Sequence, residues 1–549
     1  MNRAIMIVGA SGVFGSRLVT KLAAKGHRHF ILAGRDEAKA ADIVQALQSQ
    51  NCEVSFCVLD RSKPDVKLLQ SLAPYLIVDA AGPFQGSSLA LPEAAIAAGV
   101  HYIDLADARD FVARISTLDA AAKAAGVAVI SGASSTPALS HAVLDHITKG
   151  WQRIDTILVA IAPGNRAPRG LSVIKAILAG VGEPIRLLKN GKSGQSFGWA
   201  EDEQIEIAGV GRRHVALCET PDLDLLIERY HPRVSAEFKA GLELGVMHHS
   251  LRFLALLRAW KLIPNLAPLA GVFQFLARPL YPFGSDEGGM FIRVTGLNER
   301  GTATQLRWSL SAKGGIGPNI PCLPALALCL RDGLDAGAYS AAGVVSYHEM
   351  DIEFRRLGIS TQADVEAVEK QQVFQSALGG AWAQLPTITR YVHTLDPIVR
   401  LKGEADIEGA QTVLGRIVAK IFGFPSDAKR AALSVSITKN SDAEVWARHY
   451  PDRTMRSVIG LVDAEKNLIE ERFGPLRFQM RLTGNSDGLD MIMVGMTLLG
   501  IPLPTLLLPQ LIATERASAD GKHLFNVEIK QWPFGRLVHY NGWLKPDLD

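Results

Sequence analysis

Residues 8–22 read VGASGVFGSRLVTKL, in which Gly9, Gly12 and Gly15 stand between a short apolar run and a helix-like stretch. In a dinucleotide-binding fold the first glycine permits a tight turn, the second lets the backbone approach a pyrophosphate, and the third lets the helix pack against the strand. The N–H groups at the helix start then face the phosphates. A strand before the motif and a helix after it favour a nucleotide site over a glycine-rich turn.

The first part of the chain repeats this alternation of apolar run and helix. The apolar runs are Ala4–Val8, His29–Gly34, Glu53–Leu59, Tyr75–Gly82, His101–Ala106 and Val127–Ala133. They are continuous rather than alternating, as expected for strands that helices cover on both faces. Residues 1–150 are therefore predicted to form an α/β domain with a doubly wound parallel sheet of the Rossmann type.

Two further regions follow. Residues 151–359 combine alternating strand-like runs with a helical stretch between Val234 and Leu280, which predicts a mixed α+β substrate domain. Within them, residues 321–345 are a candidate extension of the Rossmann domain, because Pro321–Gly337 has a helical pattern that would pack on it. The ligand is expected between the first two domains.

The last region, residues 374–549, shows period-two alternation in several neighbouring runs, which predicts an antiparallel β-rich domain with one buried face. A polar stretch over Thr361–Gln372 marks the boundary before it.

Composition limits the class of protein. A chain of 549 residues suits about three domains. Hydrophobic residues make up 48% and charged residues 21%, which excludes a disordered chain, and a net charge of +3 gives no support for nucleic-acid binding. The five cysteines show neither a disulfide pattern nor zinc spacing, so a reducing compartment is expected. With no export signal recognised, we expect a cytoplasmic protein, or one attached peripherally to the inner face of the membrane.

The second strand decides the expected cofactor. It ends in LAGRDEAKA, residues 32–40, where Arg35 stands about 20 residues after the glycine motif. A guanidinium there can bind a 2′-phosphate with two hydrogen bonds, which favours NADP over NAD. Asp36 and Glu37 offer the alternative of an acid on the ribose of NAD, but we interpret Asp36 as a helix cap and Glu37 as a first-turn acid.

Two later strand ends complete the predicted cofactor site. Asp60 can accept a hydrogen bond from an adenine amino group, although turn formation explains it nearly as well. After the fourth strand, Ala81, Gly82 and Pro83 stand where the chain passes the ribose and nicotinamide. The full set of predicted cofactor-binding residues is Gly9, Ser11, Gly12, Val13, Phe14, Gly15, Arg35, Asp60, Ala81, Gly82 and Pro83.

These motifs bring out a resemblance. VGASGVFG, LAGR, the run from Val78 to Phe111 and SGASSTPALS resemble the saccharopine dehydrogenase-like oxidoreductase family, which includes the trans-acting enoyl reductases. The resemblance covers the first 150 residues well and the next region less clearly. It implies an NADP-binding Rossmann domain, an α/β domain that shapes the substrate cleft, and a nicotinamide oxidoreductase. The last region resembles an uncharacterised domain that is fused to such enzymes in bacteria and has no known activity.

The catalytic group is not evident from the sequence. No Tyr-x-x-x-Lys pair follows the fourth strand, so short-chain dehydrogenase chemistry is not favoured. Weak candidates are Tyr102 and Asp104, at the end of a strand near the cofactor edge, and Ser134 and Ser135, which can bind a carbonyl or carboxylate or simply cap the next helix. His248 and His249 are neighbours that point about 100 degrees apart on a helix, so we expect no metal site.

Two apolar stretches suggest a hydrophobic substrate. Leu251–Leu280 mixes apolar residues with Arg252, Arg258, Lys261 and Arg278, which is typical of a helix lying on a membrane surface. Met491–Ile512 is nearly all apolar but contains Pro502, Pro504 and Pro509, which argues against a spanning helix and favours a hydrophobic wall or a lipid cavity. Ordinary core helices and a buried loop are the alternative for both.

The sequence therefore predicts an NADP-dependent oxidoreductase acting on a small, lipid-like carbonyl or enoyl substrate. One alternative is a non-catalytic protein that binds or senses NADPH and carries a lipid- or partner-binding C-terminal module. Another is an amino-acid dehydrogenase of the saccharopine type, for which Arg166, Arg169, Arg212 and Arg213 would supply basic groups around the cleft.

Overall fold

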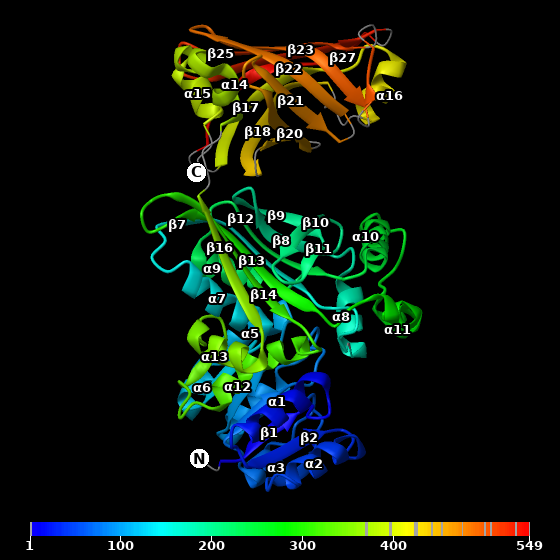
Figure 1. Ribbon diagram of the computed structural model, residues 1–549, viewed down its shortest axis with the longest axis vertical. Coiled ribbons are helices and arrows are strands. Elements are labelled where there is room, and N and C mark those ends of the chain that lie inside the picture. Colours follow the sequence, from blue (N-terminus) through cyan, green and yellow to red (C-terminus); the bar gives the residue numbers. More distant parts are fainter. Residues whose placement is uncertain are drawn as a thin grey trace. The chain divides into compact units, whose positions relative to one another are not determined.

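A computed structural model of the chain divides into two compact units, Met1–Val368 and Glu369–Asp549. The structure describes residues 3–168, 170–367, 372–394, 398–421, 427–440, 443–451, 454–474, 476–498, 501–504, 508–532 and 535–547. Each unit is described by itself (Figure 1).

The first unit begins with the predicted parallel sheet. Its strand order is β3-β2-β1-β4-β5-β6-β15, so the order reverses between β1 and β4, where dinucleotides bind in such folds. The strands are β1 (Ile5–Val8), β2 (His29–Gly34), β3 (Glu53–Val58), β4 (Leu76–Asp79), β5 (His101–Asp104), β6 (Ala128–Ser131) and β15 (Gly337–Ser340). All six predicted strands are present, which confirms the Rossmann architecture. β15 returns from the middle region to pair with β6.

Helices cover both faces of this sheet. They are α1 (Val13–Ala24), α2 (Ala41–Gln48), α3 (Val66–Leu72), α4 (Ala90–Ala98), α5 (Arg109–Ile115), α6 (Asp119–Ala125), α7 (Ser140–Ile147), α12 (Leu323–Cys329) and α13 (Tyr347–Leu357). The central strands β1 and β4 are buried along their whole length, which explains their continuous apolar sequences.

The middle region forms a second, mixed sheet with the order β10-β11-β12-β7-β13-β14-β16, to which β8 and β9 are attached beside β12. Its strands are β7 (Arg153–Ala162), β8 (Pro184–Lys189), β9 (Lys192–Phe197), β10 (Asp202–Ile207), β11 (Gly211–Leu217), β12 (Ser235–Gly241), β13 (Gly288–Leu297), β14 (Ala303–Ala312) and β16 (Ser360–Ala367). The sheet therefore continues past residue 359 into the polar stretch that suggested a boundary.

The helices of the middle region are α8 (Leu171–Gly180), α9 (Asp222–Tyr230), α10 (Gly245–Ala259) and α11 (Ala270–Ala277). The expected helical stretch from Val234 is wrong at its start, because β12 pairs with β7 there and places Ala236 and Phe238 in the core. Figure 1 shows α8, α10 and α11 together at one side of this sheet.

A buried ion pair fastens the parallel sheet to the middle region. Arg109, on α5, donates from Nε to Oδ2 of Asp224 on α9 at 2.6 Å, and from Nη1 to the carbonyl oxygen of Arg186 on β8 at 2.8 Å. The Arg109 side chain is buried and that of Asp224 is partly exposed, so removing Asp224 would leave a costly unpaired charge on Arg109.

The second unit is an antiparallel sheet that closes on itself, since β22 pairs with both β21 and β23. The order runs β22-β21-β20-β19-β18-β17-β27-β26-β25-β23, with β24 beside β23. The strands are β17 (Ile398–Glu408), β18 (Ala428–Asn440), β19 (Ala443–His449), β20 (Thr454–Asp463), β21 (Leu468–Phe473), β22 (Leu476–Asn485), β23 (Gly488–Leu498), β24 (Ile501–Pro502), β25 (Gln510–Ala517), β26 (His523–Gln531) and β27 (Gly535–Pro546). The prediction of an antiparallel β-rich domain is confirmed.

Three short helices accompany the closed sheet: α14 (Val373–Leu378), α15 (Thr387–Val392) and α16 (Val413–Ile421). The apolar stretch Met491–Ile512 belongs to β23, β24 and β25 where it is described. Residues 499–500 and 505–507 within it lie outside the described residues. Met491 and Leu511 face the interior, whereas the side chains of Ile492 and Ile512 are exposed. The described parts of the stretch thus belong mainly to strands of the sheet wall, and no helix occurs among them.

Candidate functional site

The glycine motif forms a tight turn directly after β1. Gly9 has a φ of +78° and donates its backbone N–H to the carbonyl of Ala33 at 2.9 Å. A Cβ on Gly9 would lie 2.9 Å from Cα of Ala81, and a Cβ on Gly15 would overlap the carbonyl oxygen of Gly9. Both positions therefore require glycine. Gly9 lets the turn approach the loop after β4, and Gly15 lets α1 pack against the turn.

The start of α1 has the properties of a phosphate cradle. Gly12 occupies the N-cap position and supplies no side chain to the free amides of the first turn. Ser11 and Gly12 are exposed, while Val13 and Phe14 are half-buried. Unpaired N–H groups and the positive end of the helix dipole favour a diphosphate at this point.

The next two strand ends carry Arg35 and Asp60, both exposed. Asp60 accepts hydrogen bonds from the backbone N–H of Ser62 at 2.9 Å and from its hydroxyl at 2.7 Å. These bonds lower the pKa of Asp60, with a further contribution from the positive charge of Arg35. The parallel strands thus bring the two side chains to one edge, next to the glycine turn.

The acids after Arg35 do not play the roles expected of them. Asp36 forms an ion pair with Lys39, 3.3 Å between Oδ2 and Nζ, instead of capping a helix. Glu37 itself takes the N-cap position of the following 3-10 turn (Ala38–Ala40), without a side-chain hydrogen bond. The ion pair is available because Lys39 follows at i+3.

A buried carboxylate, that of Asp79, holds the loop after β4 through a hydrogen bond to the loop backbone. Asp79 accepts a hydrogen bond from the N–H of Ala81 at 2.9 Å, and Nη1 of Arg61 donates to the carbonyl of Ala81 at 2.5 Å. Burial raises the pKa of Asp79 to about 6, although Arg61 and Ala81 oppose the shift. Gly82 and Pro83 follow as exposed residues joined by a cis peptide bond.

Tyr102 and Asp104, two weak catalytic candidates, are fully buried in β5. The hydroxyl of Tyr102 donates to Oδ2 of Asp79 at 3.4 Å. Burial raises the pKa of Asp104 to about 7. One oxygen of Asp104, Oδ1, accepts hydrogen bonds from Ala106 N, Ser131 Oγ and Gly132 N, at 2.9, 2.9 and 2.8 Å. Both side chains thus fasten loops at the cofactor edge.

The serine loop after β6 places its two candidates differently. Ser134 is buried at 8% exposure, and Ser135 is half-buried. Ser134 stands at the N-cap position of the next helical turn, but its side chain makes no capping hydrogen bond. Of the four candidate residues, Ser135 is the most accessible to a substrate.

Sequence reasoning missed a buried pair behind this loop. Nε2 of His141, on α7, lies 3.6 Å from Oδ1 of Asp222, on α9, and neither side chain is exposed. Burial lowers the pKa of His141 to about 3 and raises that of Asp222 to about 7. The signal in the sequence that could have indicated this pair is His141, a polar residue between apolar ones in SHAVLDHI, residues 140–147. The pair joins the Rossmann domain to the middle region at the cofactor edge.

The basic residues considered for an acidic substrate mostly have protein partners. Arg212 lies 3.5 Å from Glu206 and Arg213 lies 3.5 Å from Glu243, while Arg166 donates to the carbonyl of Pro282 at 3.0 Å. Arg169 lies outside the described residues.

His248 of α10 also has a partner. Nε2 of His248 lies 3.0 Å from Oδ1 of Asp202, which also contacts Nδ1 of His214 at 3.1 Å. Across the part of the chain that the structure describes, no cluster of His, Cys, Asp or Glu side chains could hold a metal ion.

A cavity of about 450 Å³ lies among α8, α10 and α11. Most of its lining is apolar, including Ile174, Ile177 and Phe273. Val246, Leu276 and Tyr281 line it as well, and they are at least half exposed to solvent. The cavity therefore borders on the surface through apolar side chains.

The fold and the glycine cradle define a dinucleotide-binding α/β protein. Residues 5–130 match the model of the saccharopine dehydrogenase NADP binding domain, which confirms both the predicted family resemblance and NADP as the cofactor. Residues 385–544 match DUF4166, a domain of unknown function. The molecule is thus an NADP-dependent oxidoreductase with a saccharopine dehydrogenase-like nucleotide domain, joined to a DUF4166 domain.

Among the solved structures that the chain resembles, one supports the fold. An apo saccharopine dehydrogenase (L-Glu forming) from Saccharomyces cerevisiae is 12% identical, with a TM-score of 0.50 over 67% of this chain and 100% of its own. A UDP-N-acetylglucosamine 3-dehydrogenase from Acidithiobacillus ferrooxidans is 12% identical, with a TM-score of 0.27 over 56% and 77%. A short-chain dehydrogenase from Sphingobium yanoikuyae in complex with NADPH is 15% identical, with a TM-score of 0.19 over 24% and 69%. No curated protein matches the sequence.

Proposed function

We propose that the first unit transfers hydride between NADP(H) and a hydrophobic, lipid-like carbonyl or enoyl compound. The apolar cavity among α8, α10 and α11 carries this proposal, because its volume of about 450 Å³ is in the range of small-molecule sites. Asn165, Gln274 and Arg278 add a few polar groups to an otherwise apolar lining. Such a lining favours a substrate with a long hydrocarbon part.

At the cofactor edge, bound NADPH would supply or accept the hydride. The Gly9–Gly15 turn would hold the diphosphate and Arg35 the 2′-phosphate, while Ala81, Gly82 and Pro83 would pass beside the ribose and nicotinamide. Ser135 and Ser134 stand at the end of β6, where a hydroxyl can donate a hydrogen bond to a substrate carbonyl oxygen. Asp104 and Asp79 would keep these loops in place.

Contact with a membrane surface is part of this proposal. Large apolar side chains on and beside α10 and α11 are exposed; they are Val246, Phe253, Trp260, Leu262, Leu269, Val272, Phe275, Leu276, Tyr281 and Phe283. Arg252, Lys261 and Arg278 are exposed among them. Apolar residues flanked by basic ones bind anionic membranes, which are found on the cytoplasmic side. Arg258 is excluded, since it turns inward to pair with Glu183.

The structure adds one observation on membranes. Within the described ranges, none of the helices combines the length and the apolar character needed to cross a bilayer.

Substrate class is tested with NADPH labelled with tritium at the transferable position. Incubation with a lipid extract should give a tritiated, protein-dependent lipid product. Ile177→Trp, which fills the cavity, should lower the yield at least ten-fold, whereas Val173→Trp on the same helix should not. A cavity variant that keeps full activity, or the absence of any labelled lipid, would overturn the lipid-like substrate.

Membrane contact is tested by flotation with vesicles of phosphatidylcholine containing phosphatidylglycerol. The wild-type chain should float with the anionic vesicles, and the triple variant Phe253→Ser, Trp260→Ser, Phe275→Ser should stay in the soluble fraction. Equal flotation of both proteins would remove this surface from the proposal.

A further inference from the structure

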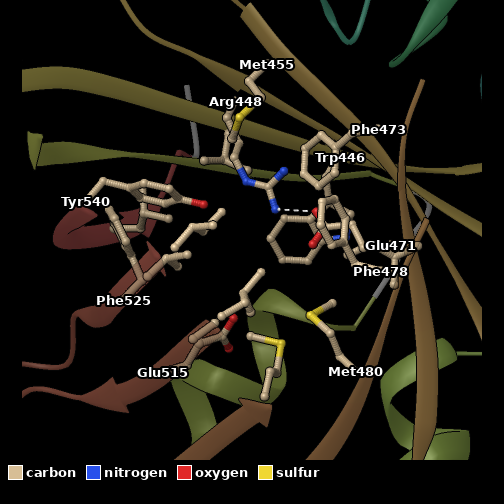
Figure 2. A pocket seen from close by; sticks show the side chains of 18 of the residues that line it. Trp446, Arg448, Met455, Glu471, Phe473, Phe478, Met480, Glu515, Phe525 and Tyr540 are labelled. Atoms are coloured by element: carbon tan, nitrogen blue, oxygen red, sulfur yellow. Dashed lines mark hydrogen bonds and ion pairs between the residues drawn. The ribbon is translucent and has the colours of Figure 1, made fainter. Parts of the chain in front are cut away.

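The closed sheet of the second unit encloses a cavity of about 80 Å³ (Figure 2). Aromatic and methionine side chains from many strands form most of its wall, among them Trp446, Phe473, Phe478, Phe525, Met455 and Met480. They come from alternate positions along the strands, since successive residues of a strand face opposite sides. The interior of the sheet is therefore lined but not completely filled.

A small group of polar side chains faces this apolar space. Nη1 of Arg448 donates to Oγ of Ser457 at 2.9 Å, and Nη2 lies 3.2 Å from Oε1 of Glu471. Figure 2 shows Arg448 and the hydroxyl of Tyr540 directed into the cavity. An arginine has five N–H donors, so these two bonds leave donor capacity unused.

Tyr450 adds a polar atom whose partner is missing. Its hydroxyl is buried and has no hydrogen-bond partner among the described residues. Tyr450 lines the cavity, and burial raises its pKa to about 12, so the hydroxyl is protonated and able to donate. A buried hydroxyl without a partner costs stability, and an acceptor on a ligand would remove this cost.

The charged groups in the interior already have partners. Arg448 is paired with Glu471, and Oε2 of Glu515 lies 2.7 Å from Nε2 of His393 and 3.6 Å from Nε2 of His523. These contacts lower the pKa of Glu515 to about 2 in spite of burial, so this carboxylate is ionised and held by its histidine partners. A charged ligand would add an unmatched buried charge, which is strongly unfavourable.

We propose that this cavity binds an uncharged aliphatic molecule whose single carbonyl or ester oxygen accepts hydrogen bonds from Tyr450 and Arg448. Its volume of about 80 Å³ is smaller than the roughly 150 Å³ cavity that holds benzene in another protein, which restricts the ligand to a short chain with few heavy atoms. Met455, Met480 and Met491 let the wall adapt to the chain, because methionine is unbranched and flexible. The site belongs to the second unit and does not depend on the oxidoreductase activity of the first.

The charge requirement is tested by calorimetric titration of the full-length protein with three small ligands of similar size: methyl acetate, acetate and ethylammonium. Methyl acetate should bind at least ten-fold more tightly than either ion. Tighter binding of an ion, or no binding of the ester, would overturn the proposal.

The location is tested by a matched pair on β25. Ala513 lines the cavity, whereas Ile512 is exposed at 52% on the outer face. Ala513→Phe should remove one ester site per chain, and Ile512→Phe should keep it. Circular dichroism and the melting temperature show whether Ala513→Phe has folded. If a folded Ala513→Phe protein retains the site, the ester binds elsewhere, for example among α8, α10 and α11, and the proposal fails.

The oxygen contact is tested by Tyr450→Phe, which keeps the ring and removes the unpaired hydroxyl. Ester affinity should fall about ten-fold, because one buried hydrogen bond is lost. NADPH binding serves as a fold control and should not change. Unchanged ester affinity would exclude Tyr450 as the donor.

Discussion

Nε of Arg61 lies 3.1 Å from Oδ2 of Asp79, whose side chain is fully buried beneath the β4 loop. The same guanidinium donates to the carbonyl of Ala81, so one side chain links the end of β3 to the nicotinamide side of the cofactor site. This link ties the placement of the loop to the neutralisation of a buried acid.

Arg61→Gln should therefore weaken NADPH binding and destabilise the first unit. Breaking a buried pair costs about 3 kcal/mol when the remaining acid is charged. Since burial holds the pKa of Asp79 at about 6, the loss should be larger at pH 8 than at pH 5, where Asp79 is protonated. Urea unfolding at both pH values and NADPH fluorescence titration measure the two effects.

Lys63→Gln is the matched control, because Lys63 is an exposed cation in the same loop. It should change neither stability nor affinity. Equal losses for the two variants would mean that overall charge, and not the contact with Asp79, is responsible.

Gly15→Ala should disrupt the cofactor site more severely than its single methyl group suggests. The added Cβ would overlap the carbonyl oxygen of Gly9 and lie 2.9 Å from Cα of Ala10, and backbone atoms cannot move away cheaply. A loss of NADPH affinity of at least ten-fold is expected. Gly271→Ala on α11 is the control, since nothing lies within 4 Å of its added Cβ, and its affinity should match the wild type.

Arg35→Asp should shift cofactor preference from NADPH toward NADH, because an acid in place of the guanidinium repels the 2′-phosphate and can bind the ribose hydroxyls instead. The ratio of the two dissociation constants is expected to change at least 100-fold. Asp36→Ala breaks the ion pair with Lys39 and should leave that ratio unchanged. An unaltered ratio in Arg35→Asp would discard Arg35 as the phosphate ligand.

The sequence predicted the nucleotide domain well because its signals are local. A strand, a glycine turn and a helix are adjacent in the chain, and buried parallel strands give continuous apolar runs. β12 was assigned to a helix because Phe238 and its neighbours stand beside a truly helical stretch. Only pairing with β7, which is distant in the chain, makes this segment a strand.

The closed sheet was predicted less completely for a related reason. The stretch Met491–Ile512 was not interpreted as strands, and β23 and β25, which include parts of it, carry apolar residues on both faces, as with Met491 and Ile492. Such strands lack the alternation that marks a half-buried sheet. They form strands because they pair with other strands of the closed sheet, and this pairing is not encoded in the local sequence.

Exposed residues beside the strand ends, such as Gly12 and Arg35, could be proposed as cofactor ligands from the sequence, whereas the residues that hold the β4 loop could not. Asp79 lies in the run from Val78 to Phe111 and Arg61 follows Asp60 directly, yet their pairing depends on the packing of β4 beside β1. Tyr102 and Asp104 were considered for catalysis because they are polar residues near the cofactor edge. Both are buried, and Asp104 holds the loop after β6 through hydrogen bonds, while their catalytic role stays a prediction.

Asp104→Asn should change how stability depends on pH. Because the pKa of Asp104 is raised by burial from 3.8 to about 7, the folded state binds the proton more tightly than the unfolded state. Stability is therefore lost as pH rises from about 4 to about 7, and this loss is complete above the folded pKa. An asparagine cannot ionise, and its side-chain oxygen can still accept the bonds from Ala106, Ser131 and Gly132. Between pH 5 and pH 8, the free energy of unfolding of the variant should thus rise relative to that of the wild type by a few kcal/mol, as measured by urea denaturation.

The variant's free energy of unfolding should still depend on pH, since Asp79 and Asp222 have raised pKa values as well. Asp110→Asn, at an exposed acid on α5, should run parallel to the wild type. If Asp104→Asn also runs parallel, Asp104 is ionised in the folded protein throughout this range, and the buried acid is not a source of its pH dependence.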